Sequence, residues 1–267
     1  EILSFLNKQT ANHPIVGSNP NLPEDHSAHM AMMMPQGRGG GQAGPAAEGR
    51  GGQRGPAGYP QGKLADLPAG IFNARSTVNN TKLRKEFVDI LVGDVKVHTW
   101  VEYPDGEAKA PIVIVMQHGP GMDEWVRALA DQLALQGFIA ISPDLHSGLG
   151  PNGGNYESFG GTDEVMRAGA RITPVEGMRR YKAAYDWGMK LPRANGKSAT
   201  IGFCAGGGYS FRFAGETPEV NASVVYYGGT PNEETMAKIK APVLAFYGED
   251  DARVTAAAEP TSATMKK

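Results

Sequence analysis

The sequence has a single cysteine, a net charge of only −2, and no apolar run of the length that a membrane span requires. One cysteine excludes an internal disulfide framework. A charge balance so close to neutral gives no general attraction to nucleic acid. Membrane spans need about 18 or more consecutive apolar residues. We therefore expect no nucleic-acid partner and no membrane partner, and the composition leaves the oligomeric state open.

The first third of the chain also lacks apolar periodicity. Residues 37–62 are dominated by Gly, Gln, Ala, Pro and Arg, and such a composition buries too little apolar surface to offset the entropy of ordering it. We predict a low-complexity, largely disordered leader over residues 1–80 and one globular domain over residues 81–267. A flexible leader before a compact domain favours an exported, periplasmic protein over a cytoplasmic one. Since Glu1 is not an initiator methionine, we expect any signal peptide to lie outside this sequence.

Two clusters within the leader have a composition that some ligands prefer. Residues 26–34 hold two histidines and four methionines, side chains that suit soft ions such as Cu(I). Arg38, Arg50 and Arg54 lie beside glycines, as in some RNA-binding segments. Neither cluster has a fixed ligand geometry or a dense charge, which favours a flexible linker for both.

Strands and helices alternate from Phe87 onward. Residues 86–91 and 95–103 alternate around Gly93-Asp94 and predict an antiparallel hairpin. Continuous apolar runs predict buried strands, and apolar residues at helical spacing predict helices between them. The expected strands are 111–116, 138–142, 198–203, 222–227 and 243–247, and the expected helices are 123–136, 174–191, one from Cys204 through Phe213, and 233–239. This order predicts a mostly parallel sheet covered by helices on both faces, the three-layer α/β sandwich of an α/β-hydrolase.

Three informative segments follow strands of this sheet. They are residues 117–121, Cys204, and residues 248–251. Because active sites in such sheets form at the carboxyl ends of the strands, we expect the three segments to converge.

Cys204 lies where an apolar strand meets a glycine cluster and a helix start. A sharp strand-to-helix turn strains its middle residue, and the residues two before and two after it must be small. Gly202 and Gly206 occupy those places. The pattern indicates an enzyme nucleophile at Cys204. The alternative is that Cys204 is a small buried residue in a glycine-rich turn.

The chain resembles the dienelactone hydrolase family of α/β-hydrolases in three motifs, at residues 141–145, 202–207 and 247–254. The resemblance covers about residues 87–267 and implies hydrolysis of a small-molecule carboxylic ester or lactone. It implies Cys204 as nucleophile, Asp251 as the acid that orients a catalytic histidine, and the backbone N–H groups of Gly119 and Ala205 as the oxyanion hole. No metal and no organic cofactor is expected, because the protein supplies every reacting group. For Asp251 the alternative is an acid that caps a helix beginning near Thr255.

The sequence departs from the family in its histidines. No histidine follows Asp251, although the order in this fold is nucleophile, acid, histidine. We therefore expect the domain to lack its last strand and helix, and these 267 residues alone to be nearly inactive. The absent histidine also supports another hypothesis, a non-catalytic relative that binds a ligand or partner.

Two histidines are candidates for the substrate pocket. His118 stands where relatives tend to carry a glutamate that helps to activate the thiol, and it could polarise the thiol or contact the substrate. His146 lies on the next strand-end loop, and the loop 146–172 is expected to form much of the pocket wall. The alternative for both is a structural role, which we favour for His146.

Overall fold

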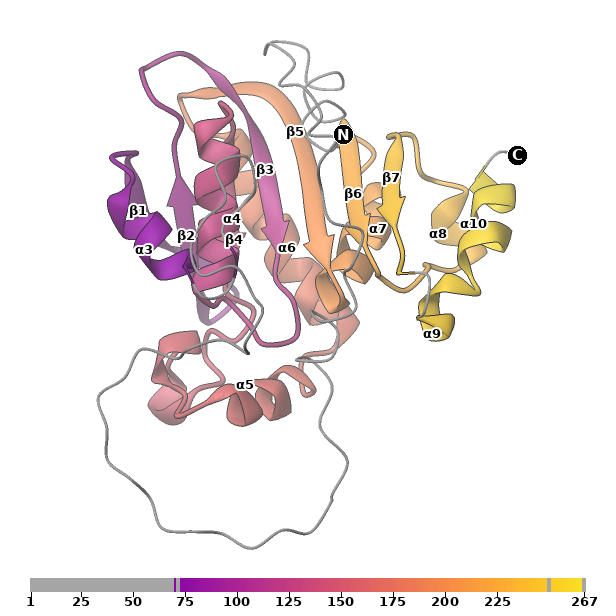
Figure 1. Cartoon of the computed structure of the whole chain (residues 1–267), viewed down its shortest axis with the longest axis horizontal. Coiled ribbons are helices and arrows are strands. Elements are labelled where there is room, and N and C mark those ends of the chain that lie inside the picture. The colour runs from indigo at the N-terminus through magenta and orange to yellow at the C-terminus, as the bar shows by residue number, and fades with distance from the viewer. Residues whose placement is uncertain (1–69, 71–72, 249–250, 266–267) are drawn as a thin grey trace, which may run out of the picture.

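The computed structural model describes residue 70, residues 73–248 and residues 251–265 (Figure 1). The remainder of the predicted leader, with its two clusters, lies outside these residues, as do Glu249 and Asp250. Seven strands form one sheet in the order β1-β2-β4-β3-β5-β6-β7. They are β1 (Lys85–Val92), β2 (Val95–Glu102), β3 (Ala110–Met116), β4 (Ile139–Pro143), β5 (Ala194–Phe203), β6 (Ala222–Tyr226) and β7 (Val243–Phe246).

The sheet is mixed but mostly parallel, which confirms the prediction. β1 pairs antiparallel with β2, and β2 pairs antiparallel with β4. β4, β3, β5, β6 and β7 are all parallel to one another. Every residue of β3 is buried, as expected for a central strand with helices on both faces.

Helices cover both faces of the sheet and make the three layers. α3 (Ala74–Asn80) and α4 (Glu124–Leu135) lie on one face, and α6 (Pro174–Met189) and α7 (Ala205–Glu216) lie on the other. Leu133 of α4 belongs to a core cluster with Val113 and Ile201, and Tyr181 of α6 to a second one with Ile112. The shorter elements are the 3₁₀ turns η1 (Pro151–Gly153) and η2 (Tyr156–Ser158), and the helices α5 (Thr162–Gly169), α8 (Glu233–Met236), α9 (Ala252–Thr255) and α10 (Ala258–Met265).

Two of the helices lie in segments that were predicted to be a disordered leader and a loop. α3 lies within the range assigned to the leader, and it buries Ala74 and Val78, which are one helical turn apart. α5 lies within the polar loop 146–172 and buries Val165 and Ala168. In both cases two small apolar residues suffice once a neighbouring surface covers them. Within the described part of the chain, no helix combines the length and apolar character that crossing a membrane would demand.

A buried group of charges joins the layer of α3 and α4 to the hairpin. Glu102 and Asp131 are fully buried. Lys85 Nζ lies 3.3 Å from Glu102 Oε1 and 3.6 Å from Asp131 Oδ1, and Trp100 Nε1 donates to Glu102 Oε2 at 3.1 Å. One lysine cannot neutralise two buried carboxylates, so the pair retains a proton. Burial, followed by the neighbouring Asp131, raises the pKa of Glu102 to about 8.

Stability should therefore fall as the pH rises from about 5.5 to 8.5. The folded-state pKa of Glu102 exceeds its ordinary value of 4.5, so the stability it contributes is complete below that value and is lost as the pH passes through about 8. We expect the free energy of unfolding of Glu102→Gln to change less with pH. Between pH 5.5 and 8.5 the wild type should lose about 2 kcal/mol more of this free energy than the variant loses. Denaturant unfolding at a series of pH values measures the effect. The exposed Glu107→Gln is the matched control, and equal slopes in all three proteins would contradict the assignment.

Candidate active site

Cys204 lies at a sharp turn between β5 and α7, as the sequence predicts. Its backbone has φ 55° and ψ −115°, a strained conformation for a residue with a side chain. A Cβ atom on Gly202 would lie 2.0 Å from the Gly206 carbonyl oxygen, and one on Gly206 would lie 2.1 Å from the Met116 carbonyl oxygen. Glycine is therefore required at both positions, because the neighbouring backbone leaves no room for a side chain.

The turn presents Cys204 at the positive end of α7. The Cys204 N–H donates to the Tyr226 carbonyl oxygen at 3.0 Å, which ties the turn to β6. Ala205 is the first residue of α7, so its N–H has no acceptor within the helix. The thiol is half-buried. A partly exposed sulfur at a helix N-terminus is placed where negative charge on it is stabilised.

Gly119, the other predicted oxyanion donor, lies in a turn that follows β3. The Gly121 N–H donates to the His118 carbonyl oxygen at 3.0 Å, and Gly121 adopts φ 95°. β3 and β5 are adjacent and parallel, with Met116 opposite Gly202. Residues 119 and 205 both come three positions after this pair, so the register brings Gly119 and Ala205 to the same edge of the sheet.

His118 is buried and held by an aspartate. Asp123 Oδ2 accepts a hydrogen bond from His118 Nε2 at 2.9 Å, while Asp123 Oδ1 accepts from the Val126 N–H at 3.0 Å and caps α4. The His118 ring lies 5.1 Å from the ring of Trp125. His118 thus has the structural hydrogen bond that was its alternative role. Its contact with thiol or substrate stays a prediction. Asp123 was not singled out, although an Asp three residues before a helical valine is a recognisable N-cap.

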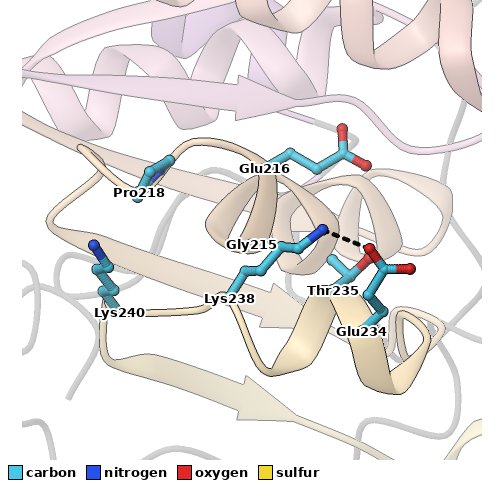
Figure 2. Close-up of a pocket in the computed structure, with 7 residues that line it drawn as sticks. All are labelled: Gly215, Glu216, Pro218, Glu234, Thr235, Lys238 and Lys240. Atoms are coloured by element: carbon cyan, nitrogen blue, oxygen red, sulfur yellow. Dashed lines mark hydrogen bonds and ion pairs between the residues drawn. The ribbon is translucent and has the colours of Figure 1, made fainter.

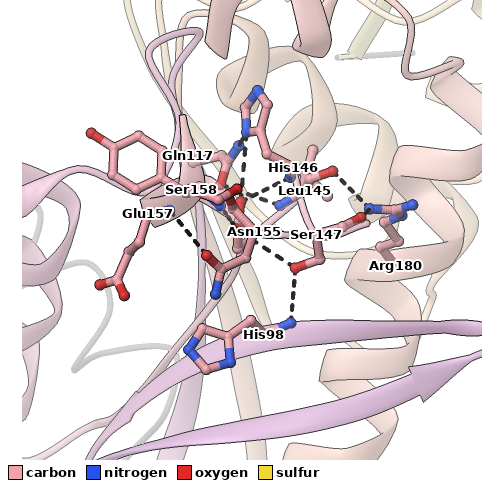
Figure 3. Close-up of polar contacts among 11 residues, drawn as sticks. His98, Gln117, Leu145, His146, Ser147, Asn155, Glu157, Ser158 and Arg180 are labelled. Atoms are coloured by element: carbon pink, nitrogen blue, oxygen red, sulfur yellow. Dashed lines mark hydrogen bonds and ion pairs between the residues drawn. The ribbon is translucent and has the colours of Figure 1, made fainter. Parts of the chain in front are cut away.

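His146 belongs to a polar network that fixes the loop after β4 (Figure 3). Gln117 Nε2 lies 3.0 Å from His146 Nδ1. The fully buried Asp144 carboxylate accepts from the His146 N–H at 2.8 Å and from the Tyr156 N–H at 2.7 Å. Arg180 of α6 donates to the carbonyl oxygens of residues 145 and 147. With 2% of its surface exposed, His146 has the structural role that the sequence favours, and lining a pocket stays a prediction.

The fixed loop places α5 over the strand ends. In Figure 1, α5 lies beyond the arrowheads of β3 and β5. A Cβ atom on Gly119 would lie 3.1 Å from Met166 Sδ of α5, while 47% of Met166 stays exposed. Met166 therefore forms an apolar wall beside the predicted oxyanion hole. The sequence predicts that this loop forms the wall but singles out no residue within it. The apolar pair 165–166 in a polar segment is the sequence feature that points to an apolar wall.

Asp251 follows β7 and has an unused acceptor. Its Oδ2 atom is buried without a hydrogen-bond partner among the described residues, and Arg253 Nη2 lies 3.8 Å from it. Asp251 occupies the N-cap position of α9, but its side chain makes no capping hydrogen bond. The capping alternative therefore does not account for this side chain.

The strand order sets Asp251 two strands from Cys204. β6 separates β5 from β7, and two strand spacings amount to about 10 Å. The three described histidines bond elsewhere: His98 to Asp89, His118 to Asp123 and His146 to Gln117. The structure thus brings the predicted nucleophile and acid to one edge without a described histidine between them.

An open pocket lies away from this edge (Figure 2). It is lined by Gly215, Glu216, Pro218, Glu234, Thr235, Lys238 and Lys240. α7 begins beside Cys204 and ends at Glu216, and twelve helical residues span about 18 Å. The pocket is at the far end of α7 and is not part of the candidate active site.

Comparison with known proteins gives consistent matches. Residues 97–267 match the Dienelactone hydrolase family. A carboxymethylenebutenolidase of Pseudomonas sp. strain P51 is 31% identical over 157 residues, 56% of this chain and 64% of that protein. One of Pseudomonas putida is 28% identical over 152 residues, 54% of this chain and 62% of that protein.

A solved structure agrees in fold. Dienelactone hydrolase from Anabaena variabilis superposes with a TM-score of 0.54 at 23% identity, over 70% of this chain and 83% of that one. The chain spans 54–64% of the length of the curated relatives it matches. The structural likeness supports the α/β-hydrolase fold.

Proposed function

The chain belongs to the dienelactone hydrolase family, and from this premise we propose that the protein hydrolyses carboxylic esters or lactones with Cys204 as nucleophile. The observation that carries the proposal is the strained backbone of Cys204 between β5 and α7, enclosed by Gly202 and Gly206. A turn of this kind has a steric cost, and it exposes a nucleophile beside the N–H groups of a helix.

The proposed reaction has two steps. The Cys204 thiol gives its proton to an imidazole, and Sγ attacks the carbonyl carbon to form a tetrahedral oxyanion. The N–H groups of Ala205 and Gly119 stabilise that charge. The carbon–oxygen bond of the ester breaks, the imidazolium protonates the leaving alcohol, and a thioester remains on Sγ. Water, deprotonated by the same imidazole, then attacks the thioester carbonyl carbon. The carbon–sulfur bond breaks, the carboxylic acid is released, and Sγ takes the proton back from the imidazolium.

Asp251 is proposed to orient that imidazole through Oδ2, which accepts no hydrogen bond from the described residues. The sequence has no histidine after Asp251, so the mechanism requires an imidazole that the 267 residues do not place at this carboxylate. We therefore also propose that these 267 residues alone hydrolyse esters only slowly. The same observation favours a second candidate function, a non-catalytic protein that binds a ligand at the strand ends.

Hydrolysis of p-nitrophenyl acetate by the complete natural protein tests the proposal. We expect saturable release of nitrophenolate, and peptide mapping after an acid quench should locate an acetyl group on Cys204. A folded protein that releases nitrophenolate no faster than buffer, or that carries the acetyl group on another residue, would overturn the proposal. The first of these results would favour the binding function.

Asp251→Asn should lower kcat by about a hundredfold or more in the complete protein, with little change in KM. An amide does not stabilise an imidazolium and favours the wrong tautomer of the ring. Steady-state kinetics with p-nitrophenyl acetate measure the change. Glu259→Gln removes one exposed negative charge from nearby α10 and should leave kcat as it is. Equal effects of the two substitutions would remove Asp251 from the mechanism.

A further inference from the structure

Met166 of α5 packs directly on the backbone of Gly119. A Cβ atom added to Gly119 would lie 3.1 Å from Met166 Sδ and 3.2 Å from the terminal methyl carbon, Cε. Apart from Gly119 itself and the residues next to it in the sequence, no other described atom comes within 4 Å of that position. The thioether is therefore the one described group in contact with this side of the residue proposed to supply an oxyanion donor.

Two further contacts fix α5 in this place. A Cβ atom on Gly121, in the loop after β3, would lie 3.0 Å from Val165 Cγ1. At the other end of the helix, a Cβ atom on Gly169 would lie 2.9 Å from Nε2 of the buried His146, in the loop after β4. Because α5 packs on both loops, Met166 has a fixed position relative to the strand ends.

The loop after β3 also touches the turn that carries Cys204. A Cβ atom on Gly206 would lie 2.5 Å from the Gln117 carbonyl oxygen. Gly206 comes two residues after the sulfur-bearing residue, and Gln117 comes two residues before Gly119. Two close contacts therefore connect the turn that presents the nucleophile to the thioether of Met166.

The order of the strands decides which part of an ester lies on this side. β3 and β7 lie on opposite sides of β5. Asp251 follows β7 and is proposed to hold the imidazole that protonates the leaving alcohol, so the alkoxy oxygen must point toward β7. The acyl chain is then left on the β3 side, next to Gly119 and Met166.

The surface of α5 on this side is apolar and offers no counter-ion to an acid. Met166 is 47% exposed. Asp163, one helical turn earlier, lies on the same face of α5 as Met166. Arg167 follows Met166 directly and lies about 100° further around the helix. An acyl chain that ended in a carboxylate would therefore meet a thioether and another acid.

We propose that Met166 determines the acyl specificity of the enzyme, and that its substrates carry an uncharged, apolar acyl group. The proposal rests on the proposed function, because it concerns the ester that Cys204 attacks. A methionine side chain is flexible and polarisable, so it adapts to apolar chains of different shape. Burial of a carboxylate beside it without a partner is unfavourable.

Two pairs of esters test the proposal by placing one negative charge on either side of the scissile bond. p-Nitrophenyl pentanoate and mono-p-nitrophenyl glutarate have five-carbon acyl chains that end in a methyl group and in a carboxylate. p-Nitrophenyl acetate and 3-carboxy-4-nitrophenyl acetate differ by a carboxylate on the leaving group. After subtraction of spontaneous hydrolysis, we expect the complete natural protein to favour the pentanoate over the glutarate at least tenfold in kcat/KM. Equal values would overturn the proposal without any variant.

Met166→Lys should reduce the preference for the pentanoate at least tenfold, because the ammonium group pairs with the glutarate carboxylate. The preference between the two acetates should change less than twofold, since their extra charge lies on the side of β7. Met166→Leu keeps the surface apolar and should retain the preference within threefold. An unchanged preference in a folded Met166→Lys variant, or an equal change for both ester pairs, would overturn the proposal.

Leu135→Lys is the matched control. Leu135 is 48% exposed, almost the same fraction as Met166, and it is the last residue of α4. This helix starts near the end of β3, and its twelve residues span about 18 Å. The variant therefore adds the same charge far from Cys204, and we expect wild-type preferences for both ester pairs.

Alkylation of Cys204 separates this proposal from the proposed function. Iodoacetamide and iodoacetate are nearly equal in size and differ in charge, and with each of them Sγ of the only thiol in the sequence displaces iodide. Met166→Lys should raise the rate with iodoacetate relative to iodoacetamide at least threefold, and Leu135→Lys should not. A change in thiol ionisation affects both reagents alike and cancels in this ratio.

The two readouts fail in different ways. If esters are hydrolysed but neither the acyl preference nor the alkylation ratio changes in Met166→Lys, the role of Met166 is overturned and the hydrolase proposal stands. If no ester is hydrolysed, the proposed function fails and the acyl preference fails with it. A raised alkylation ratio would then still support the placement of Met166 beside a group bound to Sγ.

Discussion

Replacing Cys204 with alanine should reduce kcat/KM for p-nitrophenyl acetate at least a thousandfold. The substitution removes the only thiol in the sequence and with it the covalent thioester step. The proposed oxyanion donors would remain, because Ala205 and Gly119 contribute backbone N–H groups, and they can still stabilise the oxyanion formed by direct attack of water, so a small residual rate is expected. Initial rates over a range of substrate concentrations measure the loss.

The alanine variant should keep its fold. Cys204 is half-buried, and alanine has a Cβ atom like that of cysteine, so the strain at φ 55° is unchanged. A melting temperature within a few degrees of the wild-type value would separate loss of chemistry from loss of structure. Undiminished hydrolysis by a folded alanine variant would remove Cys204 from the mechanism.

The turn at Cys204 could be predicted because its constraint is local in sequence. Two glycines flank one residue at fixed spacing, an apolar strand precedes it and a helix follows. The sheet could be predicted for a similar reason, since the wholly buried β3 appears in the sequence as one continuous apolar run. In each case the determining residues are neighbours along the chain.

The neighbours of Cys204 could not be predicted in the same way. The Tyr226 carbonyl oxygen accepts the Cys204 N–H only because β5 and β6 pair in parallel, with Phe203 opposite Tyr226. Arg180 of α6 reaches the carbonyl oxygens of residues 145 and 147, more than thirty positions away in the sequence, only because α6 packs beside the loop after β4. The pairing of strands and the seating of helices depend on tertiary packing, which a single sequence does not specify residue by residue.

α3 and α5 illustrate a related limit. Each buries only two residues of its own, too few to give a periodic signal. The loop that precedes α5 is held by the network around Asp144 and Arg180, whose members are scattered along the chain. The composition of the loop was thus enough to predict that it forms the pocket wall. It was not enough to predict that Met166 is the residue that does so.

Gly206→Ala should lower the stability of the fold by about 3 kcal/mol or more, a larger loss than from most single substitutions. The added Cβ atom would lie 2.1 Å from the Met116 carbonyl oxygen and 2.5 Å from that of Gln117. Both are backbone atoms, at the end of β3 and just after it, so no side-chain rotation relieves the contact. α7 would have to move away from the end of β3.

That movement would also displace the two groups that the proposed mechanism needs together. The Ala205 N–H belongs to α7 and Gly119 follows β3, so separating the helix from the strand opens the oxyanion hole. We expect a fall in melting temperature of about 10 °C and, in whatever protein remains folded, a fall in kcat rather than a rise in KM. Gly229→Ala is the matched control, since an added Cβ atom there meets nothing within 4 Å. If both variants melted like the wild type, the close approach of α7 to β3 would not be a constraint of the fold, and the steric argument for Gly202 and Gly206 around Cys204 would fail with it.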